Sequence, residues 1–141
     1  MMMAVLMTGL FFFGAGQVKA QADCKSLVAR SKKQRDCWVK KVIDGEKNLA
    51  GAYLKDAYLF RVDLSGANLS GANLSRANLI DVDLTKVNLR DADLSGATLS
   101  GADLSGAILS GAILTDAIVY RPTTKGVDFD DWIKRGGIVE D

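Results

Sequence analysis

Histidine is missing from this sequence of 141 residues, and its absence excludes several kinds of chemistry. Histidine is the commonest general base near neutral pH, the commonest metal ligand and the usual partner of a nucleophilic serine or cysteine. The sequence has two cysteines, Cys24 and Cys37, which are too few to hold a structural metal ion without histidine. We therefore expect a protein that is not an enzyme, with no catalytic residues, no metal and no cofactor.

An excess of charge of one sign is also lacking. The sequence contains 18 Lys and Arg against 17 Asp and Glu, so composition favours neither a nucleic-acid binder nor an acidic mimic. Residues 23–47 hold eight basic and four acidic side chains, whereas residues 48–119 hold five basic side chains, eight Asp and no Glu. A basic N-terminal segment therefore precedes a mildly acidic body.

Residues 4–16, AVLMTGLFFFGAG, form an uncharged apolar run that is too short to span a bilayer as a helix. Small residues follow this run, in the pattern of a signal-peptide cleavage site. We expect a signal peptide over residues 1–22, cut after Ala22 or after Ala20, and an exported protein in the periplasm, a lumen or the extracellular space. An uncleaved anchor or a buried N-terminal helix is the alternative.

Export would place Cys24 and Cys37 in an oxidising compartment, where two cysteines most simply form a disulfide. On one continuous helix their Cα atoms would be about 20 Å apart, which is too far for a disulfide. Pairing therefore requires a break in the helix, which we expect within residues 31–36. Two reduced thiols on one straight helix are the alternative.

The central part of the chain has a period of five residues. A branched apolar residue recurs at every fifth position from Leu49 to Val119, and two positions before each one, from Ala52 to Ala117, stands Ala or Val. Five residues rotate an α-helix by about 500°, and a strand would send alternate leucines to opposite faces, so neither keeps them on one side. The backbone must therefore turn once in every repeat, so that the coils stack around a continuous apolar core. The frequent serines are interpreted as turn residues, because no base is present to activate them.

Four repeats, ANLSG at 67–71, ANLSR at 72–76 and ADLSG at 92–96 and 102–106, resemble the consensus of the pentapeptide-repeat family. The resemblance implies an all-β solenoid, a right-handed quadrilateral β-helix with about twenty residues in each coil. Residues 48–119 would then form nearly four coils. Some members of this family confer quinolone resistance by resembling duplex DNA and occupying DNA gyrase.

In such a coil, residues twenty positions apart lie above one another, and opposite charges then meet. Asp56 would lie beside Arg76 and Arg61 beside Asp81, as surface ion pairs that serve solubility and register. One face carries apolar side chains where the other faces carry polar ones, and these residues are Tyr58, Phe60, Ile80, Ile118 and Tyr120. Exposed apolar clusters are usually covered or used. We expect either that a terminal segment covers this face or that it is an interaction face.

Both flanks of the repeats are expected to cap the solenoid, because its terminal coils would otherwise expose unpaired backbone groups. Residues 23–47 form the N-terminal segment, with a helix over residues 24–43. Residues 120–141 form the C-terminal cap, with a short helix over 127–135 for which Asp128 is the expected N-cap. Trp38 and Trp132 are interpreted as the anchors of these caps. Ile108, Ile113 and Ile118 replace the usual Asp or Asn in the last coil and mark a cap or a dimer interface.

The basic side chains of the N-terminal helix allow two interpretations. Contact with an anionic membrane is one, and a solvated helix face is the one we favour, because no aromatic residues lie among the charges of residues 31–35. The residues concerned are Lys32, Lys33, Arg35, Lys40 and Lys41.

These observations predict an exported, non-catalytic structural or protein-interaction scaffold, whose partner is another protein or a second copy of the chain. We expect no nucleic-acid partner and no small-molecule substrate. The alternative is a DNA-mimicking inhibitor of DNA gyrase or topoisomerase. The net charge of the body, five basic minus eight acidic residues or −3, and the export signal favour the scaffold.

Overall fold

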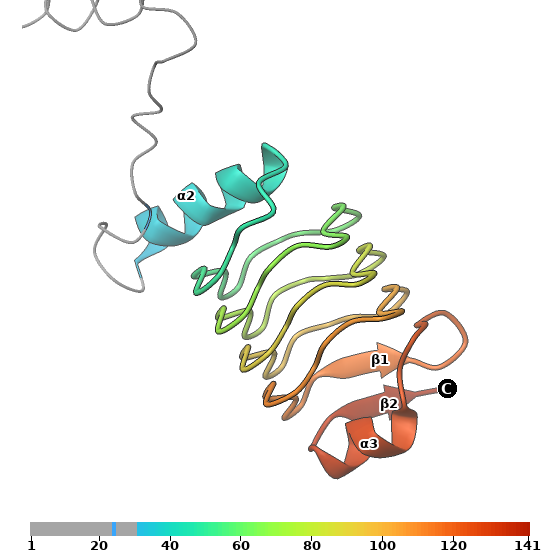
Figure 1. Cartoon of the computed structure of the whole chain (residues 1–141). Helices are drawn as coiled ribbons and strands as arrows, with labels where there is room; N and C mark the ends of the chain where they lie inside the picture. The colour runs from blue at the N-terminus through green and yellow to red at the C-terminus, as the bar shows by residue number, and fades with distance from the viewer. Residues whose placement is uncertain (1–23, 25–30) are drawn as a thin grey trace, which may run out of the picture.

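The computed structural model of the chain describes Cys24 and residues 31–141, so the predicted signal peptide lies outside the described residues. The elements follow in the order α2 (Lys32–Ile43), β1 (Ile118–Tyr120), α3 (Phe129–Lys134) and β2 (Ile138–Glu140). Between α2 and β1 the chain winds through a stack of coils, and the two short strands lie side by side at the C-terminal end (Figure 1). The coils form a four-sided β-helical solenoid whose sides are described next.

Parallel bridges between residues twenty positions apart connect each coil to the next. One column of bridges joins Asn48 to Asn68, Asn68 to Asn88 and Asn88 to Ile108, and the other three columns begin at Tyr53, Tyr58 and Asp63. These starting residues are five positions apart, so each repeat supplies one side of the coil. The twenty-residue register that the resemblance implied is confirmed.

The leucine of each repeat points into the solenoid. The leucines from Leu49 to Leu104 are at most 1% exposed, and only Leu109, in the last coil, is half-buried. The Ala or Val two positions earlier is also buried in nearly every repeat, and Val62 is half-buried. Burial of one leucine contributes roughly 2 kcal/mol, so this column is the main apolar contribution to folding.

A tight turn follows each leucine. The amide of Ala57 donates to the carbonyl of Leu54 at 3.0 Å, and the same bond recurs along the repeats. The second residue after each leucine has a positive φ, for example 64° at Gly66 and 55° at Lys86. This pattern is that of a type II turn, which requires a left-handed residue at its third position. We call these left-handed residues the corner residues.

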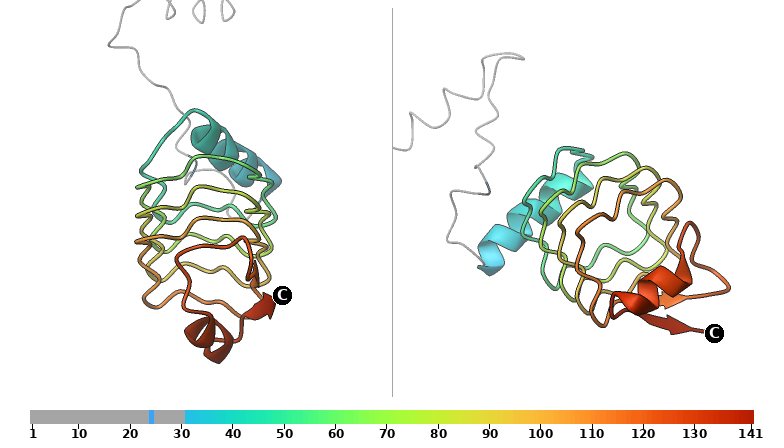
Figure 2. Two further views of the ribbon diagram at one scale, coloured as in Figure 1. Left: turned by 90° about the vertical axis from the view of Figure 1, so that its right-hand side faces the viewer. Right: turned by 60° about the horizontal axis from the view of Figure 1, so that its bottom comes forward.

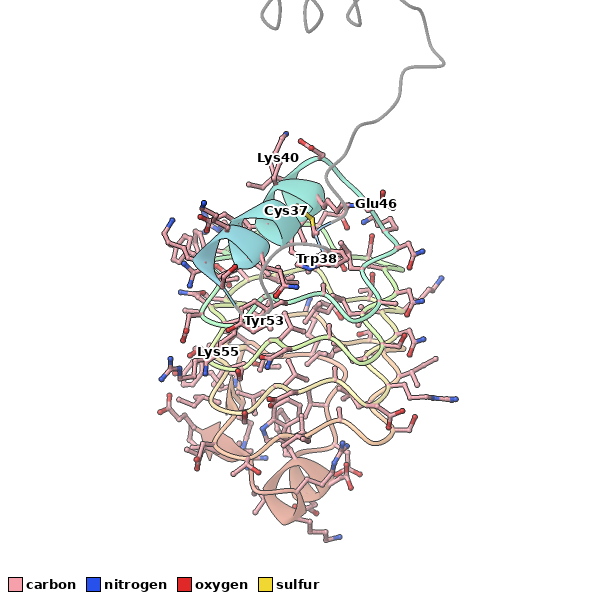
Figure 3. The ribbon with its side chains drawn as sticks, turned by 90° about the vertical axis from the view of Figure 1, so that its left-hand side faces the viewer. Cys37, Trp38, Lys40, Glu46, Tyr53 and Lys55 are labelled. Carbon is pink, nitrogen blue, oxygen red and sulfur yellow. A yellow bond between two sulfur atoms is a disulfide. The ribbon has the colours of Figure 1, made fainter. Side chains whose placement is uncertain are left out.

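The N-terminal end is covered by α2. Ser31 caps the helix by accepting a hydrogen bond from the amide of Gln34 at 3.1 Å, and the helix stops before Gly45, whose φ is 78°. Gln34, Trp38 and Val42 are its buried residues, four positions apart, and therefore form one narrow stripe toward the coils. Figure 3 shows Trp38 on the coil side of α2 and Lys40 on the opposite side.

The expectation of one helix over residues 24–43 is wrong at its start, because α2 begins at Lys32 and Ser31 caps it there. Cys24 lies outside α2 and is bonded to Cys37 of the helix, with their Cα atoms 5.7 Å apart. Residues 25–30 lie outside the described part of the chain. The helix start within residues 31–36 is the break that this pairing requires.

The C-terminal end departs from the repeat. Asp103 is bridged to Lys125, twenty-two residues on, so a two-residue insertion precedes the last turn. Thr124 stabilises this insertion, since its hydroxyl accepts from the amide of Tyr120 at 3.1 Å and donates to the carbonyl of Leu99 at 3.3 Å. The chain then leaves the coil and enters α3, whose N-cap is Asp128 as expected.

Helix α3 closes this end, and Figure 2 shows it across the end opposite to α2. Trp132 is 1% exposed, and its indole Nε1 donates to the carbonyl of Ala117 at 3.0 Å. The guanidinium of Arg135 donates to the carbonyls of Leu109 and Ala112 at 2.8 and 2.6 Å, so it pairs carbonyls that would otherwise face outward. Strand β2 then pairs with β1 in parallel, with Ile118 opposite Ile138. The cap therefore satisfies the last coil with an indole, a guanidinium and a strand.

Gly126 and Gly66 allow a matched test of the turn into the cap. Both have positive φ, 73° and 64°, but a Cβ at Gly126 would meet backbone atoms of Leu104 and Ser105, whereas a Cβ at Gly66 would meet open space. We expect Gly66→Ala to destabilise the fold by about 1 kcal/mol and Gly126→Ala by at least about 3 kcal/mol, measured by urea unfolding. Equal losses in the two variants would show that the close approach at Gly126 has no role.

Arg135 allows a test of the C-terminal cap. We expect Arg135→Ala to destabilise the cap by about 1–3 kcal/mol, because it leaves partly buried carbonyls without a charged donor. Lys134→Ala, at the neighbouring exposed position of α3, should have little effect. Hydrogen exchange of the last coil should accelerate in the Arg135 variant only, and unchanged exchange there would contradict this role of the guanidinium.

Candidate interaction face

The structure brings the five residues of the predicted interaction face to one side of the solenoid. Bridges connect Tyr58 to Asn78, Asn78 to Thr98 and Thr98 to Ile118, and β1 pairs Ile118 with Ile138. We call this side, made of residues 58–60, 78–80, 98–100, 118–120 and 138–140, the Tyr58 face. Its outward side chains flank the buried column that runs from Leu59 to Val119.

The N-terminal rung of the Tyr58 face carries an exposed aromatic pair. Tyr58 is 70% exposed and Phe60 is 36% exposed, with ring centroids 6.1 Å apart. The guanidinium carbon of Arg61 lies 4.8 Å from the centre of the Phe60 ring, which is a cation–π contact. Ile80, Ile118 and Tyr120, farther along the face, are half-buried. The aromatic pair is therefore the most accessible part of the predicted set.

A terminal segment does not lie over this face among the described residues. Helix α2 crosses the N-terminal end of the stack (Figures 1 and 2), and Tyr58 remains exposed. The C-terminal segment pairs with the edge of the face through β2 and so lengthens it by one rung. Of the three isoleucines of the last coil, Ile118 is half-buried in β1, whereas Ile108 and Ile113 remain 44% and 51% exposed on other sides.

Sequence reasoning missed the fifth rung of the face, which consists of Ile138, Val139 and Glu140. The signal was the twenty-residue register, because Ile138 follows Ile118 by that interval. The same interval separates Arg121 from Asp141, whose side chains form an ion pair at 2.7 Å. An intervening helix hides this register from a search for repeats.

Charged corner residues line both edges of the Tyr58 face. The two expected ion pairs are confirmed, with Arg76 at 2.7 Å from Asp56 and Arg61 at 3.4 Å from Asp81. All four side chains are more than a third exposed, so each pair contributes at most about 1 kcal/mol. Their main effect is to fix charge at defined heights along the edges.

The residue twenty positions after each charged corner residue, in the next coil, follows a rule. It is either an opposite charge, as in these two pairs, or a glycine. A Cβ at Gly101 would meet the carboxylate of Asp81, and a Cβ at Gly111 would meet that of Asp91. Arg76 and Lys86 lie in the same way against the next glycines, Gly96 and Gly106. Charged side chains at the corners thus fold over a neighbouring coil that has no side chain of its own there.

A column of aspartates occupies the side that begins at Asp63. Asp63, Asp83 and Asp103 are bridged in series, and each carboxylate accepts a hydrogen bond from the amide two residues later. Hydrogen bonds from the hydroxyl and the amide of Ser65, with a smaller contribution from Lys47, lower the pKa of Asp63 to about 2. The Ser105 hydroxyl and amide likewise lower the pKa of Asp103. These carboxylates therefore stabilise the turns that follow them.

The repeat serines occupy turn positions. The hydroxyls of Ser65, Ser75 and Ser95 donate to the Asp or Asn two residues earlier at 2.6 to 2.7 Å. Within the part of the chain that the structure describes, no group of three or more His, Cys, Asp or Glu is arranged to hold a metal ion.

The basic side chains of α2 are engaged locally. Lys32 forms an ion pair with Asp36 at 2.7 Å, and Lys40 forms one with Asp44 at 2.9 Å. The ammonium of Lys41 lies 5.5 Å from the ring centre of Trp38. These contacts fit a solvated helix face.

The repeats match a known family. The model of the family described as pentapeptide repeats matches eight copies, over residues 48–76 and 77–116. The chain belongs to the pentapeptide-repeat family. No curated protein matches this pentapeptide-repeat chain.

Several solved pentapeptide-repeat structures are similar to it. A protein of the Arabidopsis thaliana thylakoid lumen has 33% sequence identity, with 56% of this chain and 59% of that one covered and a TM-score of 0.50. A protein of Nostoc Pcc 7120 has 36% identity, with 74% and 94% covered and a TM-score of 0.37. This chain thus spans less than two thirds of the thylakoid protein.

A plasmid-mediated fluoroquinolone resistance protein is also similar, with 21% identity, 67% of this chain and 60% of that one covered, and a TM-score of 0.40. A likeness at that level supports no transfer of function. Among the described helices of this pentapeptide-repeat chain, none is long and apolar enough to cross a membrane.

The aspartate column predicts acid sensitivity. The pKa of Asp63 is about 2 in the folded chain and near 3.8 when unperturbed, so its contribution to stability is complete above about pH 4 and is lost as the pH falls toward 2. We expect the melting temperature to fall over that interval. Asp63→Asn, which keeps the turn chemistry seen at Asn68, should show a shallower fall. Parallel melting curves for the two proteins between pH 5 and pH 2 would contradict this assignment.

Proposed function

We propose that the chain is an exported, non-catalytic scaffold that binds a protein partner through the Tyr58 face. The observation that carries this proposal is the exposed pair of Tyr58 and Phe60, on a regular sheet face that no described segment covers. Exposed aromatic clusters on soluble proteins commonly mark interaction sites, because burying them on a partner is favourable.

The fold supports a scaffold role. A right-handed quadrilateral β-helix of nearly four coils, capped by helices, presents side chains at heights and spacings that the backbone sets. Little conformational entropy is then lost when such a face binds, since its side chains stand on a rigid ladder. Pentapeptide-repeat proteins are generally structural or interaction proteins, and the sequence offers no histidine for general base chemistry.

Export is supported by two features. Residues 4–16 have the character of a signal-peptide core, and Cys24 is bonded to Cys37, which suits an oxidising compartment. The similar Arabidopsis protein is from the thylakoid lumen. We propose that the mature chain works in a lumen, a periplasm or outside the cell.

Gyrase inhibition by DNA mimicry has less support. A DNA mimic needs an unbroken row of negative charge, whereas Asp56 and Asp81 are paired with arginines along the edges of the Tyr58 face. The acidic column at Asp63 is likewise flanked by Lys47, whose ammonium lies 3.2 Å from the Asp63 carboxylate. The charge pattern thus favours a protein-binding scaffold over a mimic.

Two isoleucine variants test the proposal. Ile80 lies on the Tyr58 face, whereas Ile113 is 51% exposed on another side. We expect Ile80→Lys to reduce the capture of the partner from an extract of the native compartment at least tenfold, and Ile113→Lys to leave it unchanged. Circular dichroism should show that both variants are folded. Undiminished binding by folded Ile80→Lys protein would refute the use of this face.

A further inference from the structure

We propose that a second copy of this chain is a partner of the Tyr58 face, in an antiparallel dimer related by a two-fold axis along the Thr98–Ser100 rung. This inference rests on the proposed function, because it names an occupant for the same face. The axis lies between the two faces and runs along the strand direction. It places Ser100 opposite the partner's Ser100 and reverses the order of the other rungs.

The side chains of the face match under this operation. The large N-terminal rung of Tyr58 and Phe60 lies against the partner's C-terminal rung at residues 138–140, and Ile80 lies against the partner's Tyr120. The smallest outward residues, Thr98 and Ser100, meet their own copies at the centre. Apolar groups therefore meet at two places, Tyr58 with the partner's Ile138 and Ile80 with the partner's Tyr120, around a small polar centre. Phe60 faces the partner's Glu140, and Asn78 faces the partner's Ile118.

The charges along the two edges are also self-complementary. On one edge, Arg61 faces the partner's Asp141 and Asp81 faces the partner's Arg121, with Gly101 at the centre. On the other edge, Arg76 faces the partner's Asp116, with Gly96 at the centre. These six charged residues lie at the edges of the face, because each stands one position after or two positions before one of its rungs. Apart from Asp56, which faces the partner's Gly136, each corner charge thus faces an opposite charge at the rim, and glycines meet at the centre.

The distribution of charge along the solenoid selects the antiparallel orientation. Residues 31–80 carry nine basic and five acidic side chains, a net charge of +4, whereas residues 81–141 carry six basic and eleven acidic side chains, a net charge of −5. A parallel dimer would also pair opposite charges at the edges, but it would place like ends together. The antiparallel dimer places each basic half beside an acidic half, which favours association.

The caps exclude the competing end-to-end arrangement. In that arrangement, β2 of one copy would pair with residues 57–61 of another copy. Helices α2 and α3 lie across the two ends of the solenoid, so they would have to occupy the same space between the copies (Figure 2). The side of the solenoid has no such obstacle. Association through the Tyr58 face thus leaves both caps in place.

The size of the face sets the expected affinity. Five rungs at about 4.8 Å and three strand residues at about 3.3 Å give a footprint of roughly 24 Å by 10 Å on each copy. This area is well below the roughly 800 Å² per partner of a standard stable interface. We therefore expect a weak dimer, which forms in solution only at high concentration and low salt.

Sedimentation velocity over a concentration series up to about 1 mM tests the dimer, because so small an interface predicts weak association. Asp116→Arg would face the partner's Arg76 and should weaken the dimer at least tenfold. Adding Arg76→Asp should restore it to within about threefold. Asp91→Arg is the matched control, because Asp91 is also an exposed, left-handed corner aspartate with no ion pair in the described structure, and it lies on another edge.

Oxidative crosslinking tests the orientation. A mixture of Tyr58→Cys and Ile138→Cys proteins should form a mixed disulfide dimer, whereas Tyr58→Cys alone should remain monomeric, because its two copies would be four rungs apart, about 19 Å. Crosslinking of Tyr58→Cys to itself would indicate the parallel dimer and overturn the proposal. A purely monomeric chain at 1 mM would also overturn it. If such a monomer still bound another protein in an Ile80-dependent way, the proposed function would stand without this inference.

Discussion

The left-handed corner residue is the constraint on which the rest of this structure depends. A backbone that must turn after every leucine needs a positive φ at the second residue beyond it, and a non-glycine residue there costs about 1 kcal/mol. Glycine occupies several of these positions, but Asp56, Arg61, Arg76, Asp81, Lys86, Asp91 and Asp116 occupy the others. Burial of a leucine in each repeat offsets this cost. The charged residues in the left-handed conformation are thereby held at fixed points along the edges of the solenoid.

The corners also explain how the coils stack. A charged corner side chain extends over the corner of the next coil. A second side chain of the same size and charge at that corner would collide with it and repel it. The sequence meets this condition either with glycine, as at Gly101 and Gly111, or with an opposite charge, as at Arg76. Register between coils is therefore specified at the corners as well as in the leucine core, and a shift by one repeat would place glycine and charge at the wrong heights.

The sequence alone predicted those parts of the fold that depend on periodicity. The spacing of the leucines required a turning chain, and the twenty-residue register of the resemblance placed Asp56 beside Arg76. Asp128 was recognised as an N-cap because its signal is local. The start of α2 at Lys32 was missed, since the apolar pattern continued upstream of Ser31 and only the cap marks the boundary.

The arrangement of the chain ends could not be predicted from local pattern. A two-residue insertion places Lys125 above Asp103, and the path through α3 then returns β2 to the register of β1. Nothing in residues 121–137 repeats with a period of five, so the fifth rung depends on tertiary contacts of Trp132 and Arg135. For the same reason, the composition of the Tyr58 face could be derived from sequence, while its exposure could not.

The return of β2 to one side gives the solenoid an asymmetry that the repeat itself lacks. The columns of the other sides end at Ile108, Ile113 and Lys125, while the Tyr58 column continues to Ile138. The longest sheet face is therefore also the one with the exposed aromatic pair and with charged corners along both edges. Trp132 and Arg135 pair three carbonyls of the last coil, and the backbone of residues 136–140 pairs with Asp116, Ala117 and Arg121. Strand β2 therefore both completes the cap and extends by one rung the surface that the aromatic residues begin.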